Sequence, residues 1–401
     1  MRKKIAVCAL AFALALSFTT VHALAEEPAQ SDNNSASQST EPSPPVDIAA
    51  KAAVLMDAST GKALVQYHGN DKLYPASVTK IMPLLLVAEA IDSGKIHLTD
   101  NVTVSAAAAS KGGSQIWLKE GETMTVEELL KAAAIYSAND ACCALGEFLS
   151  GSEEGFVKLM NQRAKELGMN NTNFVNCTGL DDETTEHLTT AYDVALMSRE
   201  LLKHDSVIKY SKVWMDSLRG GKTELVNTNR LVRFYEGATG LKTGTTTKAG
   251  CCVSASAKRG DTHLIAVVLG SGNSNDRFET AKRLLNWGFA NYETVTPVIN
   301  PGLITPVRVL RGDENSIMPV PPQAMPILVP RGSSGDLQQS VDLALDVHAP
   351  VEKGQELGKV TLTLDGETLG VYPLTAPNAV ELLTYNKVLK RLLQALVGGV
   401  A

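Results

Sequence analysis

The chain has 401 residues, of which 44% are hydrophobic, 5% aromatic and 20% charged, an ordinary composition for a globular protein. Its formal charge at pH 7 is −6, and this acidic balance argues against nucleic acid as a partner, because binding phosphate needs a basic face. The length exceeds what one hydrophobic core usually serves, roughly 100–200 residues per domain, so we expect two domains.

Residues 1–25 have the pattern of a cleavable secretory signal. Three cations at positions 2–4 precede an apolar run at 5–18 and the small-residue site Ala23-Leu24-Ala25. A membrane anchor is the alternative, but the run is shorter than the roughly 20 apolar residues that a spanning helix needs. We therefore expect an exported protein. Without these residues, which hold three cations and no acid, the formal charge is −9.

Residues 26–45 are rich in Ser, Asn, Gln, Glu and Pro and offer almost nothing to bury. Such a segment cannot offset the entropy lost on folding, so we predict a flexible linker. Beyond it we expect a first domain over 46–295, a β-rich domain over 296–378 and a C-terminal amphipathic helix over 379–401.

The first domain is predicted to mix strands and helices. Two β-like runs flank turn-forming residues at 57–62, and two more flank a turn at 258–261, which indicates two hairpins; the runs are 53–56, 63–67, 251–257 and 263–269. Apolar residues at helical spacing predict helices at 77–91, 126–149, 156–167, 189–202 and 275–292. The fourth carries a threonine at a plausible N-cap. Pro83 should kink the first, because proline lacks the N–H that a helix interior needs.

In the C-terminal part, the spacing of apolar residues changes from a helical to a strand-like pattern. Short β-like runs separated by Pro and Gly lie at 307–309, 327–329, 341–345 and 359–364. After them, residues 379–397 place one apolar stripe on a helix that also carries Lys387, Lys390 and Arg391; the stripe is Leu382, Tyr385, Leu389, Leu392 and Leu396. This composition is typical of an interfacial helix, so we expect peripheral contact with the outer face of the cytoplasmic membrane. A helix packed on its own protein is the alternative.

The cysteines do not form a recognisable framework. Cys8 belongs to the predicted signal, and the others are Cys142, Cys143, Cys177, Cys251 and Cys252. Five is an odd number, and the spacing lacks the paired C-x-x-C of a zinc site. We interpret them as small buried residues, with a free reactive thiol as the alternative, and we expect no metal and no cofactor.

Three short motifs occur in order along the first domain: Ser77-Val78-Thr79-Lys80, Ser137-Ala138-Asn139 and Lys242-Thr243-Gly244. Residues three apart lie on one helix face, so Lys80 can reach the Ser77 hydroxyl. A lysine is a base only when neutral, which needs a pKa lowered by burial or by a nearby cation such as Lys242. Each motif alone is weak; their order and surroundings carry the prediction.

With these motifs the sequence resembles the low-molecular-mass penicillin-binding proteins, the D-Ala-D-Ala carboxypeptidase family of serine peptidases (family S11). The likeness covers nearly all of residues 50–380, and the second and third motifs begin 60 and 165 residues after Ser77, which suits this family better than a β-lactamase. The segments that carry it are YPASVTKIM at 74–82, YSANDAC at 136–142, NCTGL at 176–180, NTNRL at 227–231 and GLKTGT at 240–245, followed by Ala249-Gly250. Pro83 and Thr239 depart from the usual pattern.

The resemblance implies an α/β fold: a β-lactamase/transpeptidase-like domain with an antiparallel sheet flanked by helices, then a small all-β domain and the amphipathic helix. It implies that Ser77 forms an acyl-enzyme, that Lys80 deprotonates Ser77, and that Ser137 relays a proton to the departing D-alanine. The reaction would remove the terminal D-alanine from peptidoglycan stem pentapeptides, and β-lactams would acylate the same serine.

The remaining roles implied by the resemblance concern substrate binding. Asn139 would hold the substrate amide and orient Lys80. Lys242 and Thr243 would bind the terminal carboxylate, for which a cation and a hydroxyl are suited. The N–H groups of Ser77 and Thr245 would form the oxyanion hole.

Two other functions are compatible with parts of the sequence. A serine β-lactamase would need a carboxylate to deacylate quickly; Glu183 and Glu186 lie in a loop between the second and third motifs, yet not in a recognisable deacylation loop. A non-catalytic wall-binding protein is disfavoured by the intact motifs. His187 and His263 could be bases, but a lone histidine is more often structural.

Overall fold

The computed structural model describes residues 44–182 and 184–398. The predicted signal, nearly all of the predicted linker, Glu183 and residues 399–401 lie outside the described residues.

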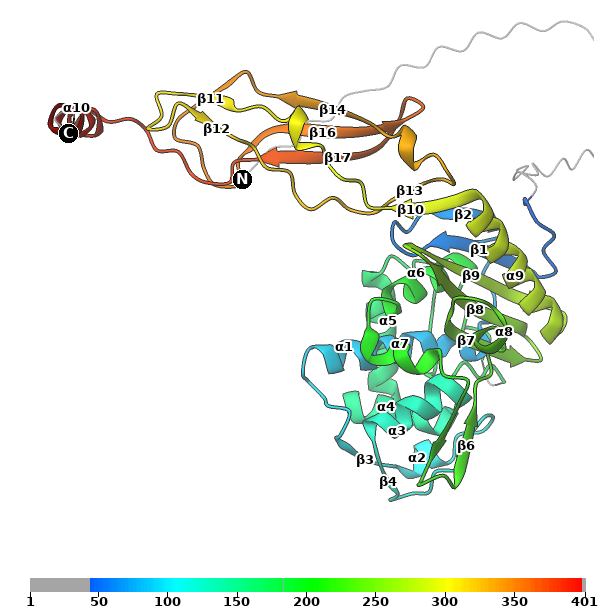
Figure 1. The fold of residues 1–401 in the computed structure, drawn as a ribbon. Coiled ribbons are helices and arrows are strands. Elements are labelled where there is room, and N and C mark those ends of the chain that lie inside the picture. The colour runs from blue at the N-terminus through cyan, green and yellow to red at the C-terminus, as the bar shows by residue number, and fades with distance from the viewer. Residues whose placement is uncertain (1–43, 183, 399–401) are drawn as a thin grey trace, which may run out of the picture. The chain divides into compact units, whose positions relative to one another are not determined.

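A five-stranded antiparallel sheet forms the centre of the first domain (Figure 1). In the order β2-β1-β9-β8-β7, its strands are β1 (Ala52–Asp57), β2 (Ala63–Tyr67), β7 (Ala238–Thr246), β8 (Gly250–Arg259) and β9 (Thr262–Ser271). Both predicted hairpins are confirmed, since β1 pairs with β2 and β8 pairs with β9. The third motif lies on β7, which is an edge strand of this sheet.

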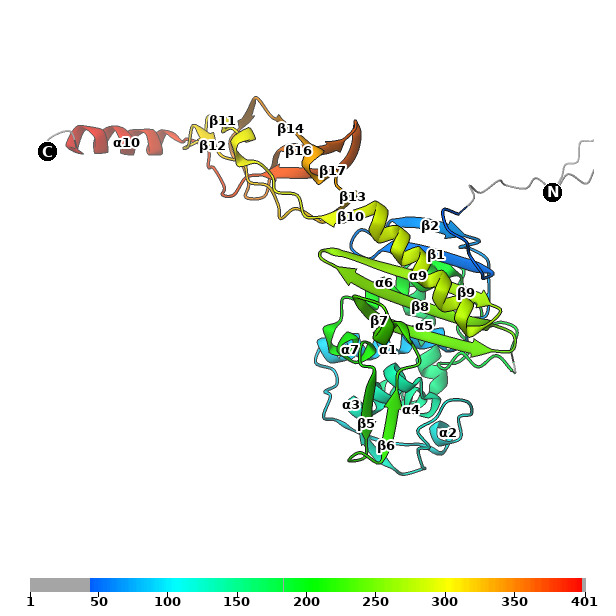
Figure 2. The same cartoon turned by 45° about the vertical axis from the view of Figure 1, so that its right-hand side comes forward.

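The two faces of the sheet belong to two hydrophobic cores. Successive side chains of a strand point to opposite faces, and in β1 Ala53 and Leu55 pack in the core that includes α9 (Ser274–Asn291), whereas Val54 and Met56 belong to the other core. That second core is built with α1 (Ile81–Asp92), α4 (Asn139–Ser150) and α6 (Ala191–Leu201). Figure 2 shows α9 crossing its face of the sheet. Val78 and Ala138 of the first two motifs belong to the core on the side opposite α9.

Further helices and short strands complete the first domain. The predicted helix at 156–167 is α5 (Glu153–Glu166), and that at 189–202 is α6, whose N-cap Thr190 accepts a hydrogen bond from the Asp193 N–H (3.0 Å). Two small antiparallel pairs are β3 (Asn101–Thr103) with β4 (Thr123–Thr125) and β5 (Met215–Leu218) with β6 (Thr223–Val226). The short helices are α2 (Ala106–Ala109), α7 (Asp205–Ser211) and α8 (Leu231–Phe234).

Two helices that were predicted to be continuous are interrupted in the structure. The first is a 3₁₀ segment, η1 (Ala76–Lys80), followed by α1 from Ile81. Pro83 therefore lies in the first turn of α1, where a missing N–H is tolerated, so the predicted kink at Pro83 is wrong and the change of conformation precedes it. The second, predicted at 126–149, divides into three pieces: α3 (Val126–Lys131), a π-helical turn η2 (Ala132–Tyr136) and α4.

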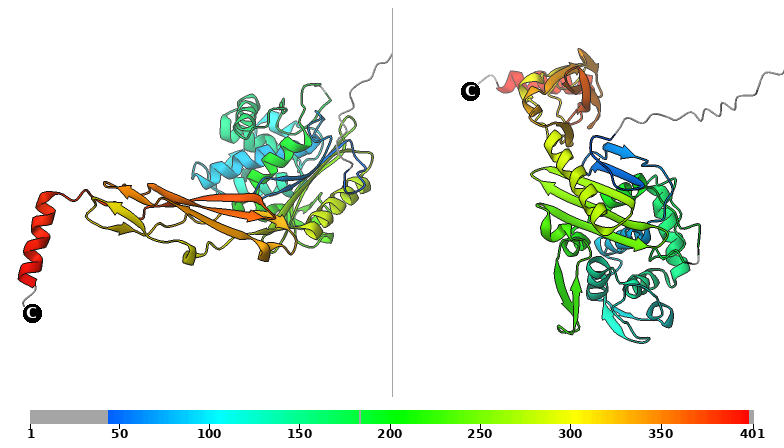
Figure 3. Two further views of the ribbon diagram at one scale, coloured as in Figure 1. Left: turned by 90° about the horizontal axis from the view of Figure 1, so that it is seen from above. Right: turned by 90° about the vertical axis from the view of Figure 1, so that its right-hand side faces the viewer.

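The C-terminal part is rich in strands, as predicted. Three long strands lie side by side and antiparallel (Figure 3): β14 (Gln338–Leu343), β16 (Glu356–Leu364) and β17 (Glu367–Thr375). The shorter strands are β10 (Tyr292–Val295), β11 (Val307–Leu310), β12 (Ser316–Ile317), β13 (Ile327–Pro330) and β15 (Asp346–His348). The four predicted β-runs coincide with β11, β13, β14 and β16. The domain boundary at 295/296 stays a prediction.

The C-terminal helix is present but begins later than predicted. It is α10 (Tyr385–Gly398), because Val380 and Leu382 instead form bridges with Val351 and Gly312 of the β-rich part. Among residues 44–182 and 184–398, no helix has both the length and the apolar character needed to cross a bilayer.

Candidate active site

The 3₁₀ turn η1 brings the first motif together. A 3₁₀ helix has three residues per turn, so side chains at i and i+3 eclipse one another. Lys80 Nζ accordingly donates to Ser77 Oγ over 2.9 Å. The predicted pairing of these two residues is thus present, and it is made by a tighter turn than the predicted α-helix.

Lys80 is fully buried. Its second hydrogen bond is to the Thr178 carbonyl oxygen, also 2.9 Å. Burial is the largest influence on Lys80 and lowers its pKa to about 8. Of the two causes that the sequence left open, burial is therefore the principal one, and near pH 8 half of the molecules carry the neutral amine that a general base requires.

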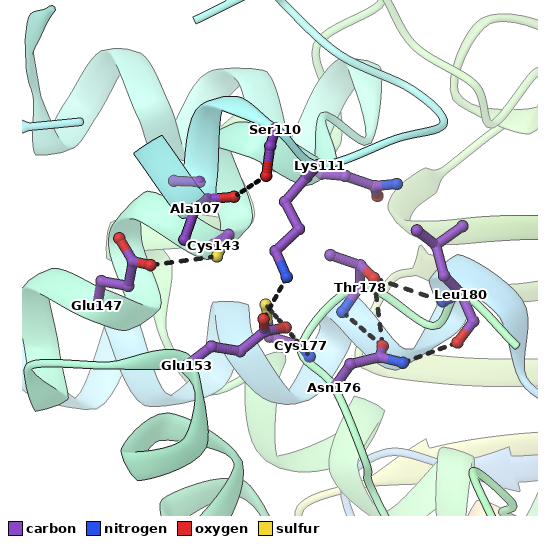
Figure 4. Close-up of polar contacts among 12 residues, drawn as sticks. Ala107, Ser110, Lys111, Cys143, Glu147, Glu153, Asn176, Cys177, Thr178 and Leu180 are labelled. Carbon is purple, nitrogen blue, oxygen red and sulfur yellow. Dashed lines mark hydrogen bonds and ion pairs between the residues drawn. The ribbon is translucent and has the colours of Figure 1, made fainter. Parts of the chain in front are cut away.

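The loop at 176–180 holds the carbonyl group that fixes Lys80 (Figure 4). Asn176 Oδ1 accepts from the N–H groups of Thr178 (3.1 Å) and Gly179 (2.7 Å), and Asn176 Nδ2 donates to the Leu180 carbonyl. Gly179 has φ +85°, and a Cβ there would lie 1.9 Å from the Ala76 carbonyl oxygen. Because glycine has no Cβ, the loop can approach η1 this closely.

The second motif lies where the predicted long helix is interrupted. Ser137 adopts the left-handed conformation (φ 69°), and α4 starts two residues later at Asn139. This break projects both side chains into the site. Neither Ser137 Oγ nor Asn139 Oδ1 has a hydrogen-bond partner among the described residues, although both atoms are buried. Buried polar atoms are rarely left unpaired, so these two are suited to a ligand.

Asn139 does not contact Lys80 through a hydrogen bond in the described part of the chain. Its side-chain nitrogen donates to the Gly112 carbonyl (2.6 Å), and its backbone N–H donates to the Ser114 carbonyl (2.7 Å). These contacts tie the loop at 112–114 to the start of α4. The described contacts that orient Lys80 are those with Ser77 and Thr178.

The third motif places a second buried lysine in the site. Lys242 is 1% exposed, and its ammonium has no hydrogen-bond partner in the described ranges. Burial, together with the positive charge of Lys80, holds its pKa well below the usual range. Thr243 Oγ1 donates to Thr228 Oγ1 (2.7 Å) and so faces the predicted NTNRL segment. A buried lysine amine without a partner, beside hydroxyl groups, is suited to binding an anion.

The edge strand β7 lies directly against the catalytic turn. A Cβ at Gly244 would lie 2.6 Å from the Ser77 nitrogen, so glycine is required for this approach. Arg277 of α9 secures the same stretch from the far side of the sheet, because its Nη1 donates to the Gly244 carbonyl (2.9 Å), Thr245 Oγ1 (3.0 Å) and the Cys252 carbonyl (3.2 Å). The strand end that carries Thr245 is thereby fixed.

Sequence reasoning missed Arg277, which has no motif around it. The available signal was a charged residue on the apolar stripe of a helix, since Arg277 lies one turn before Ala281 and two before Leu284. Asp181 was missed as well. Its carboxylate accepts from Thr246 Oγ1 (2.6 Å), which links the 176–184 loop to the end of β7.

Both histidines have side-chain contacts within the fold. His187 Nδ1 accepts from the Val175 N–H (3.1 Å), so its Nε2 donates to Thr79 Oγ1 (2.9 Å). His263 Nε2 lies 2.9 Å from Thr239 Oγ1, the residue that departs from the usual pattern. Burial lowers the pKa of each histidine to about 4, and both are therefore neutral near pH 7.

Comparison with known proteins agrees with this geometry. The family model for D-alanyl-D-alanine carboxypeptidase (peptidase S11) matches residues 37–273, more than half of the chain. The chain belongs to this family. A second model, the C-terminal domain of penicillin-binding protein 5, matches residues 292–382. The predicted enzyme class, a carboxypeptidase that is a hydrolase, and the predicted fold class are confirmed.

Relatives of this carboxypeptidase match over most of its length. The D-alanyl-D-alanine carboxypeptidase DacF of Bacillus subtilis is 44% identical over 346 residues, covering 85% of this chain and 88% of the relative. The solved structure of penicillin-binding protein 5 from Haemophilus influenzae has a TM-score of 0.75 at 32% identity and covers 84% of this chain and 99% of that one. Penicillin-binding protein D2 of Listeria monocytogenes, solved in an ampicillin-bound form, has a TM-score of 0.56 at 31% identity over 60% of this chain and 98% of that one.

The pKa of Lys80 sets a pH dependence for the carboxypeptidase. A general base must be neutral, so the hypothesis of a Lys80 base predicts that kcat/KM for D-alanine release rises with pH and levels off above about 8. The measurement is a pH–rate profile on the free enzyme. Lys80→Arg is the matched control, since a guanidinium keeps the charge but stays protonated, and it should be inactive at every pH. A profile that is flat down to about pH 5 would contradict a lysine base.

Proposed function

We propose that this carboxypeptidase removes the terminal D-alanine from peptidoglycan stem pentapeptides through an acyl-enzyme on Ser77. The observation that carries the proposal is the 2.9 Å contact between Ser77 Oγ and the buried amine of Lys80. A neutral Lys80 takes the hydroxyl proton as Oγ attacks the carbonyl carbon of the penultimate D-alanine. The tetrahedral intermediate then expels the terminal D-alanine, and water later hydrolyses the ester.

Proton delivery to the leaving amine is assigned to Ser137. Its hydroxyl is buried, has no partner among the described residues, and is held in place by the left-handed backbone between η2 and α4. A hydroxyl both accepts and donates, so Ser137 can pass a proton from the Lys80 ammonium to the amine nitrogen. Asn139, with its free Oδ1, is assigned to the substrate amide N–H.

The oxyanion hole is assigned to the N–H groups of Ser77 and Thr245. The approach of Gly244 to the Ser77 nitrogen brings these two parts of the backbone together. Arg277 fixes the Thr245 side of the pair. Preorganised donors of this kind stabilise the negative charge that develops on the carbonyl oxygen.

The substrate's terminal carboxylate is assigned to Lys242 and Thr243. The buried Lys242 amine has no described partner, and a bound carboxylate would favour its protonated form and supply the counter-charge. This preference explains why a carboxypeptidase, which acts beside a free terminus, needs a cation at this place.

β-Lactams are proposed to acylate the same serine. The supporting observation is that a structure similar to this chain was solved with ampicillin bound. A serine β-lactamase is the less favoured function. Such an enzyme needs a positioned carboxylate for deacylation, but the Glu186 side chain is exposed, and the described contact of this residue is made by its backbone carbonyl, which accepts from Asn173 Nδ2. Glu183 lies outside the described residues. Rapid turnover of a chromogenic β-lactam would favour the β-lactamase.

Export and attachment to the outer face of the cytoplasmic membrane are also proposed. The apolar stripe of the C-terminal helix is uncovered in its described part: Tyr385 is 79% exposed, Leu389 43% and Leu392 57%. Such a stripe would otherwise be buried against protein, so its exposure supports an interfacial helix over a packing helix. Lys387 pairs with Asp313 (2.7 Å), so one of the three cations expected to attract anionic lipid is already paired within the protein.

Replacing Ser77 tests the nucleophile. Ser77→Ala should abolish covalent labelling by penicillin and lower D-alanine release by at least about 10³-fold, because no other atom carries the acyl group. Intact-protein mass spectrometry measures the adduct. Ser93→Ala, at the exposed end of α1, is the control and should label normally. An adduct on the Ser77→Ala protein would falsify the assignment.

Replacing Lys242 tests the carboxylate site. Lys242→Ala should lower kcat/KM by roughly 10- to 100-fold for a peptide ending in D-Ala-D-Ala, the loss expected for one charged hydrogen bond. The same peptide with an amidated C-terminus should lose much less. The exposed Lys222→Ala is the control. Equal losses for both peptides would mean that Lys242 acts on the chemistry at Ser77 rather than on the carboxylate.

Removing α10 tests the membrane proposal. Deletion of residues 385–401, which spares the bridges made by Val380 and Leu382, should leave D-alanine release unchanged and abolish sedimentation with anionic vesicles. Salt should weaken binding of the full-length protein only partly, because apolar burial contributes beside charge. Leu389→Glu should reduce binding without truncation. If the full-length protein stays in the supernatant and the deletion lowers the melting temperature, α10 is a packing element.

A further inference from the structure

Two cysteines and a glutamate, side chains of the types that ligate metals, gather beside the loop that carries Thr178 (Figure 4). Cys143 comes from α4, Glu153 is the first residue of α5, and Cys177 belongs to the loop that fixes Lys80. One sulfur from each cysteine and one carboxylate oxygen all lie within 4.8 Å of one another. Glu153 Oε1 also accepts from the Cys177 backbone N–H (3.2 Å) and thiol (3.3 Å).

The donor set fits a soft divalent cation. Two thiolates and a carboxylate are ligands that Zn²⁺ takes in tetrahedral sites, with the fourth position open to water. Ligand atoms in such a site lie about 3.5–3.8 Å apart, as follows from Zn–S and Zn–O bonds of roughly 2.3 and 2.0 Å. In the free protein Cys177 Sγ is 3.3 Å from Glu153 Oε1, and all three ligand atoms lie within 4.8 Å of one another, so only small movements separate them from this geometry.

A cation already occupies the entrance to this group. Lys111 forms an ion pair with Glu153, and the two side chains are only 26% and 18% exposed. Both line an open cleft of about 400 Å³, together with Asn176 and Thr178. Cys143 and Cys177 are buried and are not in a disulfide; the Cys143 thiol donates to Glu147 Oε1 over 3.8 Å. A dissolved metal ion can therefore reach the carboxylate from solvent and take the place of the ammonium.

We propose that Cys143, Glu153 and Cys177 bind one thiophilic divalent cation of the Zn²⁺ class in place of the Lys111 ammonium. The two thiols ligate as thiolates, so binding releases two protons to solvent, and Lys111 turns into the cleft. The sequence predicts no metal here because the ligands come from three separate segments and form no C-x-x-C spacing. The proposal is independent of the reaction at Ser77.

The test uses the full-length mature protein, kept reduced, with Cd²⁺ as the probe. Bound cadmium should give a sulfur-to-metal charge-transfer absorption that saturates at one equivalent and is displaced by Zn²⁺. Cys143→Ser and Cys177→Ser should each weaken cadmium binding at least tenfold. Cys251→Ser, which removes a thiol on β8 away from the group, is the matched control and should bind like the wild type.

A gain of binding separates the proposal from simple misfolding. Lys111→Met removes the competing ammonium, so it should bind cadmium several-fold more tightly, a result that a damaged fold does not produce. The proposal is overturned if reduced wild-type protein gives no saturable absorption, if the absorption survives in the Cys143→Ser and Cys177→Ser proteins, or if Lys111→Met does not bind more tightly. A Cys143–Cys177 disulfide found by mass spectrometry under the same reducing conditions would overturn it as well.

Discussion

The site depends on keeping two lysine ammonium groups out of water. Lys80 and Lys242 are both buried, and the charge of Lys80 adds to the burial that lowers the pKa of Lys242. Removing a charge from water is unfavourable, so the folded protein favours the neutral amine. For Lys80 the pKa falls from 10.5 to about 8, and in that window the unfolded chain binds the extra proton. The free energy of unfolding therefore rises with pH between these values, by about 3 kcal/mol in total for this group.

The sequence was sufficient to predict strands and helices that have a regular pattern of apolar residues. Strands β1, β2, β8 and β9 of the central sheet follow from runs of apolar and β-branched residues, and α5, α6 and α9 from helical spacing. It failed where a helix changes its winding. Periodicity cannot distinguish a continuous helix from one interrupted by a 3₁₀ or π turn, because the apolar stripe shifts by only a fraction of a turn. Both failures fall on motif serines, Ser77 and Ser137, where tertiary contacts impose the unusual backbone.

Contacts between distant segments could not be predicted from one sequence. Ser77, Lys80 and Lys242 could be predicted as site residues because three short motifs occur in a fixed order along the chain. Thr178 offers only a backbone carbonyl to Lys80, and Arg277 reaches β7 through the sheet from α9. Neither kind of contact leaves a pattern in the residues around it. The start of α10 was missed for a related reason, since Val380 is held by a bridge to a strand segment far away in the chain.

The two glycines that flank the catalytic turn mark positions where no side chain fits. A Cβ at Gly179 would overlap the Ala76 carbonyl, and one at Gly244 would overlap the Ser77 nitrogen. Atoms therefore cannot be added at either position without displacing the backbone that carries the nucleophile. A copy of this gene that kept the serine and the lysines but replaced either glycine would encode a protein with the motifs of the enzyme and a collapsed site. The presence of both glycines is thus a criterion for telling active relatives of this protein from inactive ones that have kept the motifs.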